Sequence, residues 1–338
     1  MEHMKEIHDQ KPRTPNLRRM KAKLIFNSSA GAARGSPIEI LDVIHEMQAW
    51  KLMPEAFLVE PGCDLSVVVQ NALAQGIRMF VVCGGDGTIL AVAGALTGTR
   101  ATLGIIPAGT QNNVALSLGI PSDIPAAIAI LRTGRRIKVD MGIAACGQIV
   151  RPFLLACVMG LGSAIFPSAD DVQHGNLARI GDFLAALVAS PSADMRLVLD
   201  NKQEIHTQGH MALVSNMPYI GLHFQVSAAA MFNDGLLDVL LFTDLSKLEL
   251  LGYAAQKALG VGTEDSRIQH FQARSVEMDI QPAMPVMADG LEMGEGPLHI
   301  TVQRHALAVM VGTSAPKAAQ KRRPYPAIIE AQTHATAG

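Results

Sequence analysis

The sequence predicts an α/β fold, with an N-terminal domain built on a parallel sheet and a second domain of mainly antiparallel strands. The length of 338 residues suits two domains. From about Lys21 to Asp140, strand-like and helix-like segments alternate, as they do in parallel βαβ units. Beyond Asp140 the segments become short and β-rich, and turn signals such as Asn233-Asp234-Gly235 separate them.

The first domain is expected to alternate strands with helices. Strands are predicted over residues 23–27, 77–83 and 101–106, and helices after residue 36, after residue 64, over 88–96 and over 125–132. Ser36 and Glu39 have the spacing of a capping box, which marks a helix start. Asp64 can cap the second helix, and Gly76 can supply the left-handed residue at its end. The nearly continuous apolar run before Gly84 predicts a strand that is buried on both faces.

The second domain is expected to consist mainly of short strands. These are predicted over residues 150–159, 195–199, 204–207, 211–215, 236–242, 275–280 and 298–302, with helical stretches near 177–189 and 247–259. The change of pattern places the domain boundary near residue 142. We therefore expect a flexible basic tail over residues 1–21, a first domain over 22–141, a second domain over 142–313 and a basic tail over 314–338.

Composition excludes several classes of protein. With 49% apolar and 17% charged residues, the chain has enough apolar surface to fold. It contains no run of about 18 uncharged apolar residues, which a transmembrane helix requires, and its polar start differs from a secretory signal. The four cysteines stand apart without metal-binding spacing, as is typical of reduced thiols. We therefore expect a cytoplasmic protein with no transmembrane segment.

The charge distribution is uneven, although the net charge is only −2. Residues 1–23 carry seven Lys or Arg against three Asp or Glu, and residues 315–338 carry four against one. Basic ends on an acidic body fit loose attachment to an anionic phospholipid face, which would make the protein peripheral at the inner membrane face. The alternative is that the tails are simply solvated. Neither interpretation includes a nucleic-acid partner.

The first chemical motif is a glycine-rich turn between a strand and a helix. It contains Gly84, Gly85, Asp86, Gly87 and Thr88. Glycines allow backbone N–H groups to approach phosphate oxygens there, and the following helix N-terminus favours negative charge. Asp86 brings a negative charge to the same place, which makes sense when a cation such as Mg²⁺ lies between its carboxylate and a phosphate. The alternative is a tight turn with a solvated aspartate.

A second turn of the same kind follows one βαβ step later. Residues 104–115 again run from a strand through a turn into a helix, and this segment contains Gly109, Thr110 and Asn112. Adjacent strands of an open parallel sheet end at one crevice. These three residues are therefore expected to face the first turn across a bound nucleotide.

Together the two motifs resemble those of the diacylglycerol kinase catalytic family, which includes bacterial lipid kinases and sphingosine kinases. GGDGT alone is shared with NAD kinases and, loosely, with 6-phosphofructokinases, whereas GTQNNVA after it is characteristic of the lipid kinases. The resemblance covers roughly residues 22–313. It implies a first domain similar to that of NAD kinases and phosphofructokinases, a second domain of β-sandwich type, and an active site between the two.

The resemblance also implies binding roles in both domains. Asn27, which lies in the family's first loop, would contribute to nucleotide binding. The sequence DGLLD, which begins at Asp234, matches a loop that holds a structural Mg²⁺ in bacterial members, where the Met231 and Leu236 carbonyls would be further ligands. Without the resemblance, a plain β-turn would be the preferred explanation of this Asp-Gly sequence.

Two departures from the family pattern concern catalysis. The family's DGE appears here as Asp289-Gly290-Leu291-Glu292, with one residue inserted. In the family the glutamate acts as general base on the lipid hydroxyl, so the resemblance implies Glu292 as the base, or Asp289 in its place. A one-residue shift reverses side-chain direction in a strand, so Glu292 reaches the site only if a bulge or tight turn absorbs the insertion. Asn113 stands where many members have aspartate, which removes one carboxylate of their metal network.

The sequence and the resemblance therefore predict a lipid kinase that uses ATP and Mg²⁺. Its catalytic residues would be Asp86, Glu292 and Asp289, and its nucleotide-binding residues would be Asn27, Gly84, Gly85, Gly87, Thr88, Gly109, Thr110 and Asn112. The acceptor would be a lipid hydroxyl at a membrane surface, on a diacylglycerol-like, sphingoid or phosphatidylglycerol-like lipid. The alternatives are an NAD kinase-like enzyme and a non-catalytic nucleotide or lipid sensor. The sequence specifies no oligomeric state, and a homodimer stays open.

Overall fold

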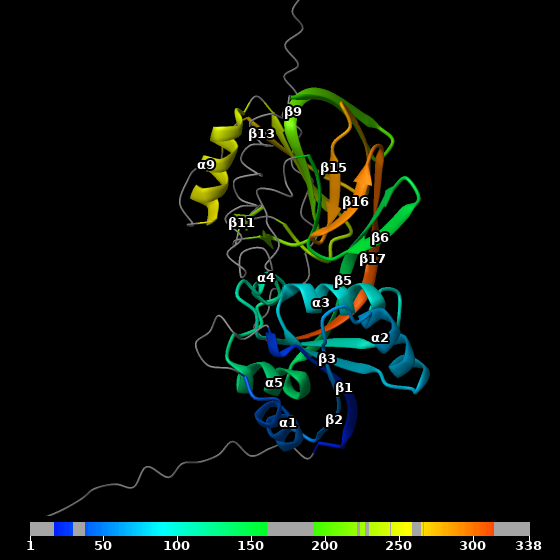
Figure 1. Cartoon of the computed structure of the whole chain (residues 1–338), viewed down its shortest axis with the longest axis vertical. Helices are drawn as coiled ribbons and strands as arrows, with labels where there is room; N and C mark the ends of the chain where they lie inside the picture. Colours follow the sequence, from blue (N-terminus) through cyan, green and yellow to red (C-terminus); the bar gives the residue numbers. More distant parts are fainter. Residues whose placement is uncertain are drawn as a thin grey trace, which may run out of the picture.

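The computed structural model describes residues 17–29, 38–160, 192–221, 224–226, 230–243, 245–258, 265 and 267–313. In Figure 1, helices flank a sheet in the lower, blue-to-green part, and strands dominate the upper part. The predicted α/β fold, with parallel strands in the first domain and antiparallel strands in the second, is confirmed. The helix predicted over residues 177–189 lies outside the described residues.

The first domain is built on a parallel sheet. Its strands are β1 (Met20–Phe26), β2 (Leu52–Leu58), β3 (Met79–Gly84), β4 (Thr102–Pro107) and the last part of β17 (Leu298–Val311). Their spatial order is β17-β4-β3-β1-β2, and each neighbouring pair is parallel. Because β17 comes from the end of the described chain, the sheet of the first domain is completed by a strand from far along the sequence.

Helices cover both faces of this sheet. They are α1 (Ile40–Ala49), α2 (Leu65–Ala74), α3 (Asp86–Leu96), α4 (Asn113–Ser117) and α5 (Ile124–Thr133). α1 and α5 pack on the face that contains Val81, whereas α2 and α3 pack on the face that contains Val82. Successive strand residues point to opposite faces, so every residue of β3 is buried, as its apolar run predicted.

One predicted helix start is confirmed and another is wrong. Asp64 caps α2 by accepting a hydrogen bond from a backbone N–H at 2.8 Å, and Gly76 follows the helix with a φ of 83°. α1 begins only at Ile40, because Glu39 has an extended backbone with a ψ of 127° and its side chain caps nothing. A capping box requires the cap to precede the first helical residue directly, so the helix start predicted after Ser36 is wrong.

The second domain consists mainly of antiparallel strands around a core of its own. They are β5 (Arg135–Cys146), β6 (Ile149–Phe153), β7 (Ala156–Gly160), β8 (Ala193–Leu199), β9 (Gln203–Ser215), β10 (Tyr219–Ile220), β11 (Phe224–Gln225), β12 (Leu237–Thr243), β13 (Ile268–Ala273), β14 (Ser275–Gln281), β15 (Pro285–Ala288) and β16 (Leu291–Glu295). The long strand β9 pairs with β7, β8 and β12. Buried side chains such as Cys157, Val214 and Met284 form one apolar cluster inside the domain.

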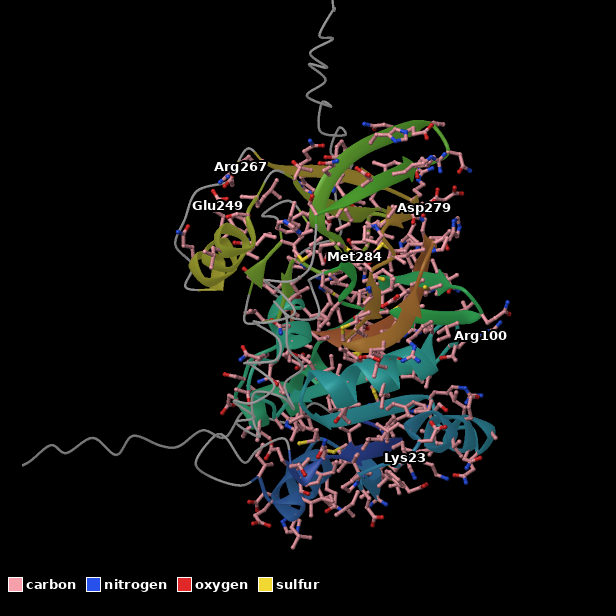
Figure 2. The ribbon with its side chains drawn as sticks, turned by 45° about the horizontal axis from the view of Figure 1, so that its top comes forward. Lys23, Arg100, Glu249, Arg267, Asp279 and Met284 are labelled. Atoms are coloured by element: carbon pink, nitrogen blue, oxygen red, sulfur yellow. The ribbon has the colours of Figure 1, made fainter. Side chains whose placement is uncertain are left out.

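The remaining helix, α9 (Lys247–Ala258), lies on the outside of the second domain. Figure 2 shows Glu249 and Arg267 together at this edge, where Arg267 Nη1 donates to Glu249 Oε1 at 2.8 Å. Arg267 Nη2 also donates to Asp265 Oδ2 at 2.8 Å, so one guanidinium joins the helix to the segment before β13. In the described ranges, no helix has both the length and the apolar character of a membrane span.

Two strands connect the domains. β5 continues without interruption through residue 142, where the sequence pattern placed the domain boundary. β17 pairs with β5 along most of its length, with β14 of the second domain near its start, and with β4 of the first domain near its end. One continuous sheet therefore runs through both domains and sets their relative placement.

Candidate active site

The two glycine-rich turns lie side by side at the ends of neighbouring strands. β3 and β4 pair in parallel, with Gly84 opposite Pro107. The Ala108 N–H donates to the Gly84 carbonyl oxygen at 3.0 Å, which joins the starts of the two turns. The loop after β1 lies next to them, because the Asn27 N–H donates to the Cys83 carbonyl oxygen at 2.9 Å. The strand ends therefore converge, as expected for an open parallel sheet.

Glycines are required where the two turns touch. A Cβ atom on Gly109 would lie 2.5 Å from the Gly85 Cα, and one on Gly84 would lie 3.2 Å from the Thr88 Cβ. Gly87 differs, because it is exposed and a Cβ atom there would have open space around it. Gly85 and Gly109 thus allow the turns to approach each other, Gly84 makes room for the Thr88 side chain, and Gly87 leaves the start of α3 accessible.

Three of the predicted polar residues form hydrogen bonds within these turns. Asn27 Nδ2 donates to Thr88 Oγ1 at 2.9 Å. Asn112 has a left-handed backbone with a φ of 54°. Its Oδ1 accepts from the Gly109 N–H at 2.9 Å, and its Nδ2 donates to the Gly109 carbonyl oxygen at 2.7 Å. Thr110 is exposed, so it differs from these three in facing solvent.

Asp86 connects the first turn to the start of α4. Its Oδ2 accepts a hydrogen bond from the Asn113 N–H at 2.8 Å, and its Oδ1 accepts from the Val114 N–H at 3.1 Å. The first N–H groups of a helix lack partners within the helix, and a carboxylate there satisfies them. Asp86 is therefore held in one position between the two turns.

Asn113 reaches from the first domain to the second. Its side chain is only 3% exposed. Its Nδ2 donates to Asp86 Oδ2 at 3.2 Å and to the carbonyl oxygen of Gly221, which follows β10, at 2.7 Å. Its Oδ1 is buried and accepts no hydrogen bond from the described residues. The residue that departs from the family pattern is therefore a contact between the two domains.

Asp289 is a carboxylate of the second domain that backbone N–H groups hold in place. It occupies the turn between β15 and β16, and its two oxygens accept hydrogen bonds from the N–H groups of Leu154, Leu155 and Ala156 at 2.7, 2.9 and 3.1 Å. Burial raises the pKa of the Asp289 carboxyl to about 6, although these three bonds act in the opposite direction. The negative charge of Asp86 adds to the rise, so the two carboxylates interact electrostatically.

The DGLE segment contains a tight hairpin turn. Asp289 and Gly290 have φ values of 49° and 79°, as in a two-residue type I′ turn. Leu291 pairs with Ala288, and Glu292 pairs with Met287. The pairing of β15 with β16 is irregular only beyond the Met287–Glu292 pair, where Val286 lies opposite Gly294. This irregularity therefore does not change the face to which the Glu292 side chain points. 

Glu292 and Leu291 consequently point to opposite faces of the hairpin. Leu291, directly after the turn, is 53% exposed. Glu292 is also exposed, and no hydrogen bond or ion pair joins its side chain to another described residue. Three backbone N–H groups thus hold the Asp289 carboxylate in place at the turn, whereas the Glu292 side chain extends from β16 on the face opposite to Leu291.

The loop that contains Asp234 is partly buried. Asp234 Oδ1 accepts from the Leu236 N–H at 3.0 Å. Burial raises the pKa of the Asp234 carboxyl to about 6, and the charges of Asp238 and Asp140 raise it further. Asp140 is fully buried, and its carboxylate accepts from the Gly235 N–H at 2.7 Å. Several carboxylates therefore share a poorly solvated region around this loop.

This loop has oxygen atoms that fit a hard cation. Asn233 Oδ1 is buried without a partner among the described residues, and it directly precedes Asp234. Mg²⁺ and Ca²⁺ take carboxylate and carbonyl oxygens as ligands. No group of three or more His, Cys, Asp or Glu side chains in the described ranges is arranged to hold a metal, so a cation here would need backbone carbonyls such as those of Met231 and Leu236.

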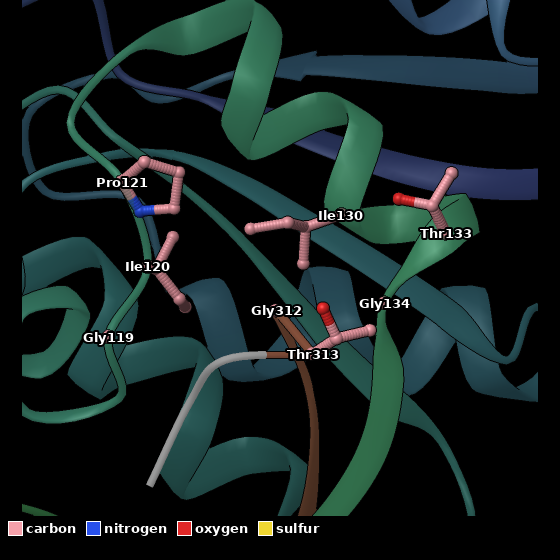
Figure 3. A pocket seen from close by; sticks show the side chains of 8 residues that line it. All are labelled: Gly119, Ile120, Pro121, Ile130, Thr133, Gly134, Gly312 and Thr313. Atoms are coloured by element: carbon pink, nitrogen blue, oxygen red, sulfur yellow. The ribbon is translucent and has the colours of Figure 1, made fainter.

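A cavity of about 500 Å³ lies elsewhere in the first domain (Figure 3). It is lined by Gly119, Ile120, Pro121, Ile130, Thr133, Gly134, Gly312 and Thr313. None of the predicted site residues lines it, and none of its lining side chains carries a charge. Phosphate groups bind where cations or several N–H donors converge, so the lining of this cavity does not favour a nucleotide.

Comparisons with known proteins agree with these features. Residues 21–144 match the diacylglycerol kinase catalytic domain, and residues 160–311 match the YegS C-terminal NAD kinase beta sandwich-like domain. A diacylglycerol kinase of Mycobacterium tuberculosis is 30% identical over 251 residues, which are 73% of this chain and 81% of that protein. The second domain is therefore of the β-sandwich type that the family resemblance implied.

Solved structures share the fold. A diacylglycerol kinase from Bacillus anthracis has a TM-score of 0.67 at 20% identity, covering 88% of this chain and 98% of that chain. An NAD kinase from Archaeoglobus fulgidus in complex with ATP has a TM-score of 0.50 at 13% identity, covering 87% of this chain and 94% of that chain. The Mycobacterium relative and the matched domains identify the family: this chain belongs to the diacylglycerol kinase catalytic-domain family.

Proposed function

We propose that this protein transfers the γ-phosphoryl group of ATP to a lipid hydroxyl group, with Mg²⁺ as the cation. Membership of the diacylglycerol kinase family makes it a lipid kinase, while the nucleotide, the cation and the class of acceptor are the content of the proposal. One observation carries it: Asp86 lies between the two glycine-rich turns of the first domain, where its carboxylate accepts hydrogen bonds from the Asn113 and Val114 N–H groups at the start of α4.

The phosphates of ATP are expected to bind at the start of α3. Gly87 is exposed and has open space around it, so a phosphate oxygen can approach the backbone there. Gly85 and Gly109 let the two turns come together, Gly84 makes room for the Thr88 and Asn27 side chains, and Thr110 is exposed in the second turn. Asn27, Thr88 and Asn112 would act by holding the turns in shape, because their side chains bond within them.

The oxygen atoms at this place fit Mg²⁺. The Asp86 and Asp289 carboxylates raise the local negative charge, and the buried Asn113 Oδ1 has no partner among the described residues. Mg²⁺ is usually held in kinases by one or two carboxylates together with substrate phosphates, and it offsets charge on the transferred group. Asp86 would be its principal protein ligand. In the second domain, Asp234 with the Met231 and Leu236 carbonyls would hold a structural ion.

Asp289 is the proton acceptor that we propose for the lipid hydroxyl. A carboxylate can accept about four hydrogen bonds, and three backbone N–H groups use three of these positions. A pKa of about 6 keeps this group mostly ionised at neutral pH and makes it a better base than an ordinary aspartate. Glu292 is the second candidate for the base, because it lies on the same hairpin as Asp289. Its side chain points to the face opposite to that of Leu291.

Phosphoryl transfer depends mainly on positioning and on charge stabilisation. In this arrangement the first domain binds the nucleotide and the second provides the base and the region for the acceptor. The lipid itself would be diacylglycerol-like, sphingoid or phosphatidylglycerol-like, presented at a membrane surface.

The test is transfer of label from γ-labelled ATP in the presence of Mg²⁺. Acceptors are mixed micelles that each contain one of the three lipid classes, with NAD as a separate acceptor and Asp86→Asn assayed in parallel. Label in one lipid, lost in the variant, is the expected result and identifies the acceptor. Label in NAD would establish an NAD kinase-like activity instead. Binding of ATP and lipid without transfer to any acceptor would contradict the proposal and support a sensor.

A further inference from the structure

Asn113 forms an unusual contact for a residue at a phosphate-binding turn, because it touches both domains with a single amide. Its Nδ2 donates to Asp86 Oδ2 at 3.2 Å and to the Gly221 carbonyl oxygen at 2.7 Å. Gly221 is more than a hundred residues away in sequence and follows the short strand β10, which packs against α4. The side chain is 3% exposed, so neither bond is weakened by competition with bulk water.

The amide of Asn113 satisfies both partners of this position. Asp86 Oδ2 and the Gly221 carbonyl oxygen are both acceptors, and the –NH₂ group of asparagine has two hydrogens to donate. An aspartate would offer no N–H to Gly221 and would place a second carboxylate where Nδ2 now lies, close to Asp86. Two carboxylates so near each other and out of water require a proton or a cation between them.

We propose that Asn113 is a positioning residue that fixes the second domain to the phosphate-site aspartate and makes this closed arrangement independent of a cation between the two side chains. The ATP-binding turns lie on one side of this contact, and the hairpin that contains Asp289 lies in the domain on the other. Holding these two parts in register lets the nucleotide and the acceptor meet in a reactive geometry. The departure from the family's aspartate is then a change in how the domains are joined.

This inference rests on the proposed role of Asp86 at the phosphate site, but its test does not require kinase activity. The experiment uses the full-length protein without nucleotide or lipid, in EDTA and in Mg²⁺. Amide hydrogen exchange at residues 219–221 reports local opening of the segment whose carbonyl group Asn113 binds, and the melting temperature reports overall stability. The effect of Mg²⁺ on the wild type serves as the baseline, so any ion bound near Asp234 is accounted for.

Three variants distinguish the loss of a contact between the domains from the loss of a hydrogen bond within the first domain. Asn113→Ala removes both hydrogen bonds, Asn113→Asp removes them and adds a charge, and Asn112→Asp is the matched control. Asn112 Nδ2 also donates to a backbone carbonyl at 2.7 Å, but that carbonyl belongs to Gly109 in the same turn. The control therefore loses an equivalent hydrogen bond within the first domain only.

In EDTA, exchange at residues 219–221 is expected to accelerate at least about fivefold in both Asn113 variants, the factor that corresponds to loss of one hydrogen bond of ordinary strength. Mg²⁺ should reverse this in Asn113→Asp and leave Asn113→Ala unchanged. Asn112→Asp should melt at a lower temperature with exchange at 219–221 like that of the wild type. Wild-type exchange in Asn113→Asp without Mg²⁺, or acceleration in the Asn112→Asp control, would overturn the inference.

Kinetics provide a second readout once an acceptor is known. Loss of positioning should lower kcat in Asn113→Ala by at least about tenfold and change the KM for ATP by less than about twofold. A rise in KM for ATP with unchanged kcat would mean that Asn113 serves nucleotide binding, which contradicts a positioning role. Failure of every lipid acceptor in the wild type, with the exchange results as expected, would refute the proposed function and leave the domain contact intact.

Discussion

The two halves of the candidate site are built in different ways. In the first domain, backbone segments make the site: Gly85 and Gly109 touch, and Asn112 bonds to the turn that contains it. In the second domain, carboxylates make the site, and backbone N–H groups hold Asp289 and the buried Asp140 in place. Local sequence therefore specifies the first half, whereas contacts between distant segments specify the second.

Asp86→Asn should have the largest effect on activity, because Asp86 is the single charged residue of the first half. We expect kcat to fall at least about 100-fold, as when a principal charge-stabilising group is lost. The same change weakens the cap on α4, since an amide –NH₂ faces one of the two N–H groups that the carboxylate accepts, and should cost about 1 kcal/mol of unfolding free energy. Initial rates and melting curves measure the two effects separately.

Activity within about threefold of the wild type in Asp86→Asn would show that the first half of the site does not depend on the Asp86 charge. The site of the first domain would then work through backbone alone, and the metal assignment to Asp86 would be wrong.

The pH dependence of turnover tests the role of Asp289 in the second half of the candidate site. The base is active when ionised, and the pKa of Asp289 is raised to about 6, so kcat/KM should rise with pH up to about 6 and level off above it. Below that value we expect about a tenfold fall per pH unit. Glu292→Gln should keep this profile, with rates within about threefold of the wild type.

A profile that lies flat down to pH 5 would contradict Asp289 as the base, and loss of activity in Glu292→Gln would assign the proton transfer to Glu292. Deletion of Leu291 sharpens the choice, because it moves Glu292 to the position directly after the turn. A gain of activity on deletion would favour Glu292 as the base.

Glycine substitutions test how strictly the backbone of the first half is fixed. Gly109→Ala would place a Cβ atom 2.5 Å from the Gly85 Cα, and we expect it to cost about 1–3 kcal/mol of unfolding free energy. Gly87→Ala is the matched control, because open space surrounds that position within α3. It should be as stable as the wild type or up to about 1 kcal/mol more stable. Denaturant unfolding of both variants measures the difference, and equal stabilities would show that the turns do not need to touch.

The Asp234 loop should give the smallest effect. The pKa of Asp234 is raised by burial, so its contribution to stability is greatest at low pH and is lost as the pH rises through about 6. In EDTA, the melting temperature of the wild type minus that of Asp234→Asn should be about 2–4 °C larger at pH 5 than at pH 7.5. A difference that does not change with pH would mean that this carboxyl is not poorly solvated.

The sequence predicted the first half of the site better than the second for a physical reason. A strand, a glycine-rich turn and a helix follow one another within about ten residues of Gly84, so their meeting is local. The Leu154, Leu155 and Ala156 N–H groups that hold Asp289 have no sequence signal, because any residue except proline offers the same donor. Only the folded β7 segment brings them to the hairpin.

Two further elements were difficult to predict for similar reasons. β2 lacks an apolar run, since it is an edge strand with several exposed residues and a proline at position 54. Asn113 was identified from its sequence only as a departure, because its partner Gly221 is a backbone carbonyl from the other domain. Strand β17 similarly joins the first sheet from the far end of the described chain.

In the proposed division of roles, the first domain binds the nucleotide and Asp289 of the second domain accepts the proton. Calorimetric titration of ATP with Mg²⁺ into Asp289→Asn, together with label transfer by the same preparation, tests this division directly. We expect Asp289→Asn to bind ATP with an affinity within about twofold of the wild type and to transfer label at a rate reduced by at least about 100-fold. Transfer at the wild-type rate, or a loss of ATP binding equal to the loss of transfer, would contradict it.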